Sequence, residues 1–309
     1  MGLPPVHLFR ATLLRNTALL NDRVPVVIEG TCGPQATRVI AQLTANVMKE
    51  TWDSRIQRAR RLAAERPESN ELLAFYSRLL SAQKDIYEFL RTREGWLPCG
   101  EIARDLPVLR QAAPTLLSMV KAHGPEELAS QAHKLLQASE VELADVLAEY
   151  WRTPADSQFF AKALLQPYLS WLREAGAKPV DRHLEGGENR CPFCKGKPQL
   201  SILQVKESSS ESGGRDLICA TCLLVWPFRR VVCANCGEED PTRIGYYHAP
   251  EYDHVRVEAC DTCRHYIKAV DLTRYGFAVP LVDEVACAPL DLWIRERGYT
   301  KIEMNLLGV

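Results

Sequence analysis

The chain reads CPFC at residues 191–194, CATC at 219–222, CANC at 233–236 and CDTC at 260–263. These four C-x2-C pairs hold eight of the eleven cysteines in the 309-residue chain. A long insert, a short connector and a second insert of nearly the same length as the first separate the successive pairs. Placing Cys191 on Cys233 and Cys219 on Cys260 lays the first half of this stretch on the second, which indicates an internal duplication.

The spacing within each pair is typical of a metal knuckle. Two intervening residues let both sulfurs turn toward one point, and two knuckles supply the four thiolates of a tetrahedral site. Sulfur ligands favour zinc or iron over calcium or magnesium. We therefore predict two metal ions per chain, iron of the rubredoxin type or zinc. In the sequential arrangement, the ligands are Cys191, Cys194, Cys219 and Cys222 in site 1, and Cys233, Cys236, Cys260 and Cys263 in site 2.

A cross-braced arrangement, in which the first pair shares a metal with the third, is the alternative. The repeat favours the sequential form, because each copy can then fold around its own ion. Gly196 and Gly237 follow the first knuckle of each copy. Glycine is expected there because the backbone must adopt a positive φ and approach the sulfurs.

Disulfides and isolated thiols are the other interpretations of the paired cysteines. Structural disulfides are typical of secreted proteins, and residues 1–10 have no apolar core for a secretory signal. Redox C-x2-C sites usually occur singly beside a βαβ pattern, not as four pairs with duplicated spacing. Cys32 and Cys287 are expected to be ordinary packed or free thiols, because the four pairs already complete two sites.

Residues 36–175 predict a helical bundle with its own core. The apolar spacing favours a long helix over 37–65 and a second over 71–92 with Ser69 as its N-cap. Prolines and a glycine break residues 96–112. Further helices are expected over 113–122, 126–151 and 156–174, the last with a kink at Pro167.

The region after the bundle predicts strands. Residues 176–190 form a polar, glycine-rich linker that includes His183, and 208–214 form a mobile hairpin tip. Strands are expected over 200–205 and 216–218 in the first copy, and over 243–247 and 255–258 in the second. Residues 223–232 should pack between the two copies. A helix over 281–297, ended by Gly298, and a short closing segment complete the chain.

These elements predict an α+β, multidomain protein in which an N-terminal helical bundle precedes two tandem rubredoxin-like or zinc-ribbon subdomains and a C-terminal helix. The expected divisions are a mainly helical domain at 1–185, ribbons at 186–228 and 229–275, and a helix with a tail at 276–309. The second hairpin is rich in tyrosine and histidine, at Tyr246, Tyr247, His248, Tyr252 and His254. These side chains either cover a small core or form a face that binds a partner.

Composition excludes several functions. The 38 basic residues balance 39 acidic ones, and no apolar run reaches the about 18 residues of a membrane span. From Cys191 to Tyr275 there are 11 Lys and Arg against 11 Asp and Glu. Eight thiolates and two divalent ions bring this region to a net charge of about −4, which disfavours phosphate binding and hence nucleic acid. We expect a soluble, cytoplasmic chain.

No enzyme constellation stands out. The sequence lacks G-x-S-x-G, H-E-x-x-H and G-x4-G-K-[ST] motifs. A metal held by four thiolates keeps no open position, and catalytic metals usually need one. We predict that the protein is not an enzyme and has no catalytic residues, and that its metals are structural or redox-active.

The arrangement of residues resembles the FdhE-type formate dehydrogenase accessory proteins. The similarity lies in the four cysteine pairs together with Trp226, in Tyr266-Ile-Lys268, and in the tail motifs Val282-Asp283-Glu284, Pro289-Leu290-Asp291 and Glu296-Arg-Gly298-Tyr299. It covers residues 190–305 closely and the helical part only in type and length. Lys195 stands where glycine often follows the first knuckle.

The resemblance implies a cytoplasmic accessory protein. Such proteins assist the maturation of respiratory formate dehydrogenases and contact the catalytic subunit before its export by the twin-arginine route. Their rubredoxin-like tetrathiolate sites are expected to hold iron, with zinc chemically possible, and the eight paired cysteines are then the ligands. The alternatives are a rubredoxin-like electron carrier and, less favoured by charge, a zinc ribbon that binds nucleic acid.

Overall fold

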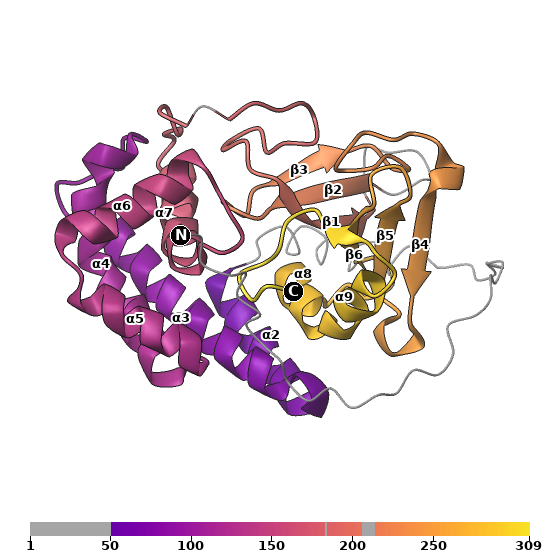
Figure 1. The fold of residues 1–309 in the computed structure, drawn as a ribbon, viewed down its shortest axis with the longest axis horizontal. Coiled ribbons are helices and arrows are strands. Elements are labelled where there is room, and N and C mark those ends of the chain that lie inside the picture. The colour runs from indigo at the N-terminus through magenta and orange to yellow at the C-terminus, as the bar shows by residue number, and fades with distance from the viewer. Residues whose placement is uncertain (1–50, 183, 206–213) are drawn as a thin grey trace, which may run out of the picture.

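The computed structural model describes residues 51–182, 184–205 and 214–309. Its helices come first in the chain, a mainly antiparallel sheet follows, and two short helices lie against that sheet (Figure 1). This order confirms the predicted α+β fold class. None of the helices in these ranges is both long and apolar enough for a membrane span.

The helix α3 (Asn70–Thr92) is central to the helical part, because it packs against α2 (Trp52–Glu65), α4 (Ile102–His123) and α7 (Phe159–Glu174). Its predicted apolar stripe is buried, at Leu72, Tyr76, Leu79, Leu80, Tyr87 and Leu90. The helices α5 (Glu126–Gln137) and α6 (Glu140–Arg152) pack on α4. The predicted helix over 37–65 is seen as α2 from Trp52 onward, and residues 37–50 lie outside the described residues, as do Cys32, His183 and most of the predicted hairpin tip.

The predicted break over 96–112 is wrong from Ile102 onward. Helix α4 runs through both Pro107 and Pro114, although each proline removes a backbone hydrogen bond. Leu109 and Leu116, on this helix, are buried in the core. Burial of this apolar face offsets the cost of the two prolines, a tertiary effect that local propensity does not contain.

The single helix predicted over 126–151 is two helices. Ser139 separates α5 from α6 through a capping box: its hydroxyl accepts from the amide of Glu142 at 3.2 Å, and its own amide donates to the Glu142 carboxylate at 2.7 Å. Ser69 precedes α3 as predicted but does not cap it. Its hydroxyl donates instead to the carbonyl of Ala286, 3.4 Å away.

Helix α7 begins at Phe159, later than its predicted start at Asp156, and continues through Pro167. Its predicted apolar face is buried, at Phe160, Leu164, Tyr168 and Leu172. The face extends further than expected, since polar Lys162 and Gln166 are also buried. Both of these side chains contact later parts of the chain: Lys162 donates to the carbonyl of Met304 in the closing segment, and Gln166 donates to the carbonyl of Ala220 after β2.

The strands form one seven-stranded sheet in the order β3-β2-β1-β6-β5-β4, with β7 on a separate stretch of β6. Neighbours are antiparallel except at β1–β6 and β6–β7, which are parallel. The strands are β1 (Pro198–Gln204), β2 (Gly214–Cys219), β3 (Val225–Phe228), β4 (Ile244–His248), β5 (Val255–Cys260), β6 (His265–Asp271) and β7 (Thr300–Lys301).

The duplication is visible in the sheet. Aligning Cys219 with Cys260 carries β2 onto β5 and places β3 within β6. The two copies meet where β1 pairs with β6, from Leu200 beside Lys268 to Leu203 beside Asp271. The prediction that residues 223–232 pack between the copies is wrong for β3, which pairs with β2 at the outer edge of the sheet. At the end of this stretch, the Val232 carbonyl accepts from Arg215, which also pairs with Glu258 of the second copy. Strand β6 was not predicted.

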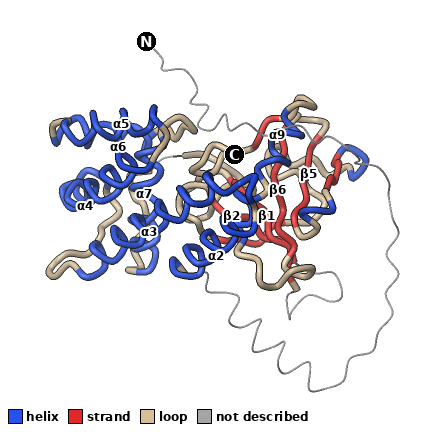
Figure 2. The backbone as a smooth tube through the Cα atoms, turned by 90° about the horizontal axis from the view of Figure 1, so that it is seen from below, coloured by secondary structure: helices blue, strands red, loops and turns tan. Residues whose placement is uncertain are grey.

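The predicted helix over 281–297 is also two, α8 (Pro280–Ala286) and α9 (Ala288–Arg295), with Cys287 between them. Cys287 is packed, as predicted, with 1% of its surface exposed. Together α8 and α9 cover one face of the sheet, and α2 packs on α8 (Figures 1 and 2).

Two hydrophobic clusters hold the parts together. The cluster beneath α8 and α9 joins Val257 and Tyr266 of the sheet to Leu281 and Ile294. The larger cluster runs through the helical part and includes the cysteines of the first copy. Helices and ribbon thus share one core, while the predicted domain boundaries stay predictions.

Candidate metal centres

The structure brings the eight paired cysteines into two groups, and the grouping is sequential. In each group the four sulfurs lie within 4.8 Å of one another. In site 1, Cys191 Sγ lies 3.5 Å from Cys222 Sγ, and Cys194 Sγ lies 3.4 Å from Cys219 Sγ. These separations are far longer than a disulfide bond of about 2.05 Å.

Site 2 repeats the arrangement. Cys233 Sγ lies 3.7 Å from Cys263 Sγ, and Cys236 Sγ lies 3.8 Å from Cys260 Sγ. Four sulfurs bound at about 2.3 Å to one central zinc ion lie about 3.8 Å apart. The donor set and its spacing therefore fit a tetrahedral tetrathiolate ion at both sites.

The knuckle backbone explains how each sulfur reaches its place. The residue after the second cysteine of each pair has a left-handed backbone: Lys195 (φ 59°), Leu223 (φ 58°), Gly237 (φ 78°) and Arg264 (φ 58°). In each copy the amide of the residue that follows the first C-x2-C pair donates to the carbonyl of the first cysteine of that pair. Lys195 donates to Cys191 at 2.9 Å, and Gly237 donates to Cys233 at 3.0 Å.

The two predicted glycines each fulfil one of the two expected roles, a positive φ or a close approach to the sulfurs. Gly237 has the positive φ, but an added Cβ there would meet nothing within 4 Å. Gly196 lacks the positive φ, which Lys195 adopts instead. A Cβ on Gly196 would lie 2.9 Å from Cys219 Sγ and 3.3 Å from Cys194 Sγ, so this glycine provides the close approach to the sulfurs.

The thiols in each group cannot all ionise without a cation. In site 1, hydrogen bonds from Cys194, Cys219 and the neighbouring Cys222 lower the pKa of Cys191, while burial raises the pKa of Cys222 well above its usual value. In site 2, burial raises the pKa of Cys233. A bound divalent ion supplies the positive charge that lets four clustered sulfurs be thiolates together.

Backbone amides also point at the sulfurs. The amide of Thr221 lies 3.4 Å from Cys219 Sγ, and the amide of Asn235 lies 3.4 Å from Cys233 Sγ. Hydrogen bonds of this kind stabilise charge on a thiolate and raise the reduction potential of an iron it binds.

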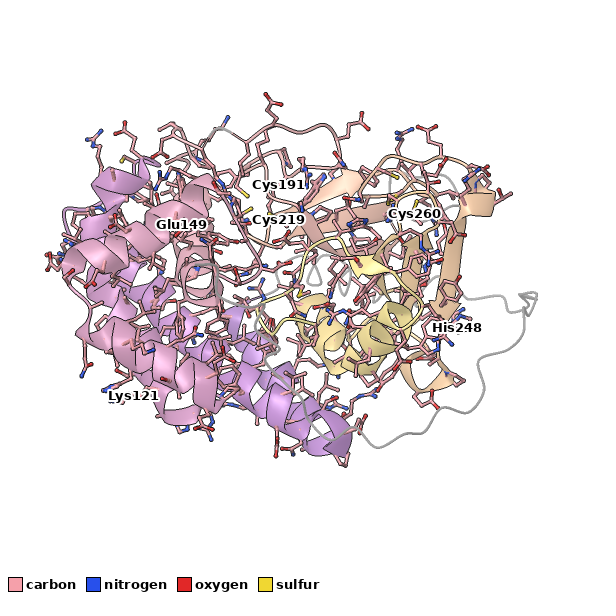
Figure 3. All side chains as sticks on the ribbon, in the orientation of Figure 1. Lys121, Glu149, Cys191, Cys219, His248 and Cys260 are labelled. Carbon is pink, nitrogen blue, oxygen red and sulfur yellow. The ribbon has the colours of Figure 1, made fainter. Side chains whose placement is uncertain are left out.

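Site 1 is covered by the helical part. Its four cysteines are at most 1% exposed. Three contacts from α6 and α7 hold the second knuckle: Tyr150 Oη lies 3.3 Å from Thr221 Oγ1, Gln166 Nε2 donates to the Ala220 carbonyl at 2.9 Å, and Arg173 Nη1 donates to the Cys222 carbonyl at 3.2 Å. In Figure 3, Cys191 and Cys219 lie between the helices and the sheet.

Site 2 lies further along the sheet, away from the helical part, as the label of Cys260 shows (Figure 3). Cys236 is exposed and Cys263 is half-buried, while Cys233 and Cys260 are buried. The equivalents of Ala220 and Thr221 are Asp261 and Thr262. Asp261 is exposed and Thr262 is also accessible at its surface.

Some of the tyrosine and histidine side chains of the second copy's hairpin cover the core, and others lie on the surface. Tyr252 and His254 are buried and belong to the interior. Tyr247 is half-buried and packs on Trp293 of α9 with ring centroids 5.2 Å apart. Tyr246 and His248 remain exposed on β4, an edge strand.

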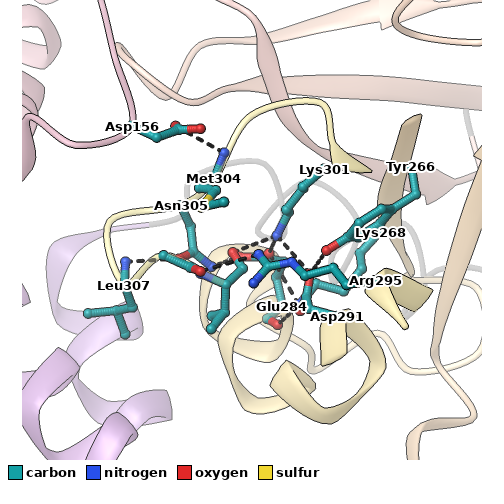
Figure 4. Close-up of polar contacts among 12 residues, drawn as sticks. Asp156, Tyr266, Lys268, Glu284, Asp291, Arg295, Lys301, Met304, Asn305 and Leu307 are labelled. Atoms are coloured by element: carbon teal, nitrogen blue, oxygen red, sulfur yellow. Dashed lines mark hydrogen bonds and ion pairs between the residues drawn. The ribbon is translucent and has the colours of Figure 1, made fainter. Parts of the chain in front are cut away.

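A cluster of buried ion pairs explains part of the C-terminal motifs that resemble the FdhE-type proteins. The sequence alone did not indicate this structural role. Lys268 of β6 pairs with Asp291 of α9, and Lys301 of β7 pairs with Glu284 of α8 (Figure 4). All four side chains are fully buried. Tyr266 Oη donates to Asp291 at 2.8 Å. Burial opposes ionisation, but Lys268 and Lys301 hold the pKa of Asp291 below its usual value.

A second buried group joins the two ends of the described chain. Asp283 of α8 accepts from Arg58 of α2 at 3.0 and 2.6 Å, and lies 2.9 Å from His254 Nε2. Arg58 also lies over the ring of Tyr275, 5.2 Å from its centroid. Only the pairing of distant residues reveals this group, so no local signal could have predicted it.

Comparison with known proteins gives consistent matches. Residues 231–307 match the family described as "FdhE, C-terminal domain". A protein named "Protein FdhE homolog" from Aquifex aeolicus is 29% identical over 260 residues, which cover 78% of this chain and 90% of that protein. A protein of the same name from Pectobacterium carotovorum is 27% identical over 281 residues, covering 84% of this chain and 87% of the relative.

Another such homologue, from Haemophilus influenzae, is 29% identical over 205 residues, or 64% of this chain and 66% of the relative. The crystal structure of the FdhE protein from Pseudomonas aeruginosa superposes with a TM-score of 0.62 and covers 84% of this chain and 95% of that one. Its sequence identity is 20%, so this likeness concerns the fold.

Proposed function

We propose, from its similarity to FdhE homologues over most of its length, that this chain is an accessory protein in the maturation of formate dehydrogenase. It binds the catalytic subunit of that enzyme in the cytoplasm, before export. The observation that carries the proposal is similarity to FdhE homologues over most of the chain, combined with both tetracysteine groups.

The chemistry of the two sites supports a role without a small-molecule substrate. Four thiolates complete the tetrahedral coordination of an ion and leave no position for a reacting molecule. The ions, iron or zinc, would be held by Cys191, Cys194, Cys219 and Cys222 in site 1, and by Cys233, Cys236, Cys260 and Cys263 in site 2. Their contribution is to fix the knuckles in place, since ribbons of this size have little apolar core of their own.

An affinity experiment tests the proposal. The tagged chain is expressed anaerobically in a bacterium that makes its native respiratory formate dehydrogenase, and the co-purified proteins are identified by mass spectrometry. We expect enrichment of the unexported catalytic subunit. Loss of that enrichment is expected for the double variant Cys236→Ser/Cys263→Ser, whose site 2 lacks two ligands.

Cys99→Ser is the matched control, because Cys99 is a partly exposed thiol that belongs to neither group. It should retain the catalytic subunit. If the unaltered chain enriches no catalytic subunit over the tag alone, the accessory role is refuted.

A second candidate function is that of a rubredoxin-like electron carrier. Two observations favour it: the amide hydrogen bonds to Cys219 and Cys233, and the exposure of Cys236 at site 2. Anaerobically purified protein would then contain iron, appear red when oxidised and be reduced reversibly by a physiological reductase. Colourless protein with two zinc ions per chain would exclude this function.

A further inference from the structure

The two candidate centres are copies of one ribbon, yet their surroundings differ. Because aligning Cys219 with Cys260 relates β2 to β5, the two sites can be compared position by position. Differences in cover between equivalent positions then come from the rest of the fold and not from the knuckles themselves.

The second knuckle of each site shows the difference. In site 1, Ala220 and Thr221 are 0% and 2% exposed and are held by Gln166 and Tyr150. In site 2, the equivalent Asp261 and Thr262 are accessible to solvent. The Thr262 hydroxyl donates at 2.6 Å to Glu238, a residue of the same copy. Thr262 is therefore held by the ribbon itself, and the neighbouring Asp261 accepts from Tyr299 of the closing segment; neither contact comes from a helix of the bundle.

The first knuckle shows the same difference. Gly196 presses its backbone against Cys219 Sγ and Cys194 Sγ, and it is itself buried. The equivalent of Gly196 in site 2 is Glu238, which is half-buried, whereas Lys195 and its equivalent Gly237 are both exposed. The sulfur of Cys236, next to Gly237, belongs to an exposed residue, whereas Cys194 is 1% exposed.

A ligand sulfur leaves its metal when a competing ligand or proton reaches the site, which requires local opening. At site 1, opening must break the contacts of α6 and α7 and disturb the core that contains these cysteines. At site 2, Cys236 is already accessible. We propose that site 2 is a kinetically exchangeable site for a thiophilic divalent ion, whereas site 1 releases its ion far more slowly.

This inference rests on the two metal sites proposed above and not on the role in formate dehydrogenase maturation. Metal exchange is measured on the purified chain alone, so its failure and the failure of the accessory role are separate results. A difference in lability would let site 2 be loaded, emptied or oxidised while site 1 keeps the ribbon attached to the helical part.

The test uses the full chain loaded with two zinc ions, with the stoichiometry verified by native mass spectrometry. The protein is challenged with excess EDTA, and samples are alkylated with N-ethylmaleimide and mapped by peptide mass spectrometry. We expect a one-zinc species to accumulate, Cys236 and Cys263 to be alkylated first, and the ion of site 1 to leave more than about tenfold more slowly.

Simultaneous loss of both ions, or earlier alkylation of Cys191 and Cys194, would overturn the proposal. A chain that takes up fewer than two zinc ions would overturn it together with the metal sites on which it rests.

Arg173→Met tests the cause of the difference. It removes the hydrogen bond to the Cys222 carbonyl while keeping the apolar stem, and it should speed zinc release from site 1 alone. The matched control is Arg152→Met, because Arg152 donates to the carbonyl of Ala148 on its own helix. Equal site 1 rates in the two variants would contradict the role given to the helical cover.

Discussion

At the residue scale, equivalent positions in the two copies carry different constraints. Lys195 and Gly237 both have a left-handed backbone, so the knuckle geometry tolerates a side chain at a cost. Gly196 cannot acquire one without displacing sulfur, because its Cβ would lie 2.9 Å from Cys219 Sγ. The sequence places a glycine in each copy, but its purpose differs between them.

Alanine substitutions separate these two purposes. We expect Gly196→Ala to weaken zinc binding at site 1, because the added methyl group forces ligand sulfurs apart. Gly237→Ala should lower the free energy of unfolding by about 1–2 kcal/mol through its backbone alone, and leave the affinity of site 2 nearly unchanged. Competition with a chromophoric chelator and urea unfolding measure the two effects. Equal loss of zinc affinity in both variants would contradict this explanation.

Glu303 gives a pH dependence at the same scale. Burial raises its pKa from 4.5 to about 7, despite Lys162 at 3.6 Å and Lys197 at 3.9 Å. A carboxyl group with a raised pKa stabilises the fold fully below its unfolded pKa and loses that contribution as the pH rises through about 7.

Glu303→Gln should therefore gain stability over the unaltered chain as the pH rises from 5 to 8, by about 1–3 kcal/mol. Urea unfolding of both proteins at each pH measures the difference, and any effect of pH on metal binding is common to both. Glu149→Gln, an exposed position on α6, should show no such change. A pH-independent difference for Glu303→Gln would argue against the buried carboxyl.

At the scale of elements, the tail is attached by buried ion pairs as well as apolar contacts. Helices α8 and α9 each contribute one carboxylate, Glu284 and Asp291, and strands β6 and β7 each contribute one lysine. The two positive and two negative charges balance. Because none of the four side chains reaches water, each charge is stabilised only by its partners in the cluster. Asn305 of the closing segment also donates to Glu284, at 2.6 Å.

Removing the charge of one residue of the buried cluster should strongly lower the free energy of unfolding. Asp291→Asn leaves Lys268 without a full counter-charge and should lower the free energy of unfolding by about 3–5 kcal/mol. Glu65→Gln removes an exposed pair with Arg61, whose side chains are 47% and 63% exposed, and should have little effect on stability because solvent screens the two charges. Chemical denaturation of both variants checks the contrast, and similar losses would refute the importance of the buried cluster.

At the scale of the whole molecule, site 1 is part of the interior that the helices and the ribbon share. Its cysteines lie in the same hydrophobic cluster as Tyr150, Trp151 and Tyr168. The cysteines of site 2 are not in this cluster, to which its first knuckle contributes only Ala234. We therefore expect loss of the ion from site 1 to affect the helical part, and loss of the ion from site 2 to leave it nearly unchanged.

We expect Cys219→Ala to alter the near-ultraviolet circular dichroism of the tyrosine and tryptophan residues packed in this cluster, and to lower the thermal midpoint of the helical signal. Cys260→Ala should leave the helical signal nearly unchanged, although it removes a ligand of the same kind. A large helical effect of Cys260→Ala would show that the two sites are equally coupled to the helices.

Local pattern determined much of this protein. The eight paired cysteines, their duplication, the apolar stripe of α3 and the strands β1, β2, β4 and β5 all follow from spacing and periodicity within short stretches. The metal sites as such remain a prediction from the thiols, to which the structure adds sequential grouping.

Tertiary structure decided the rest, because it depends on contacts between residues far apart in the chain. The continuity of α4 through two prolines, the parallel pairing of β1 with β6, and the burial of Lys268 and Lys301 arise only when the distant parts are packed together. The same packing places α6 and α7 over one copy of the ribbon and leaves the other accessible. Two similar sequence motifs thereby acquire different surroundings.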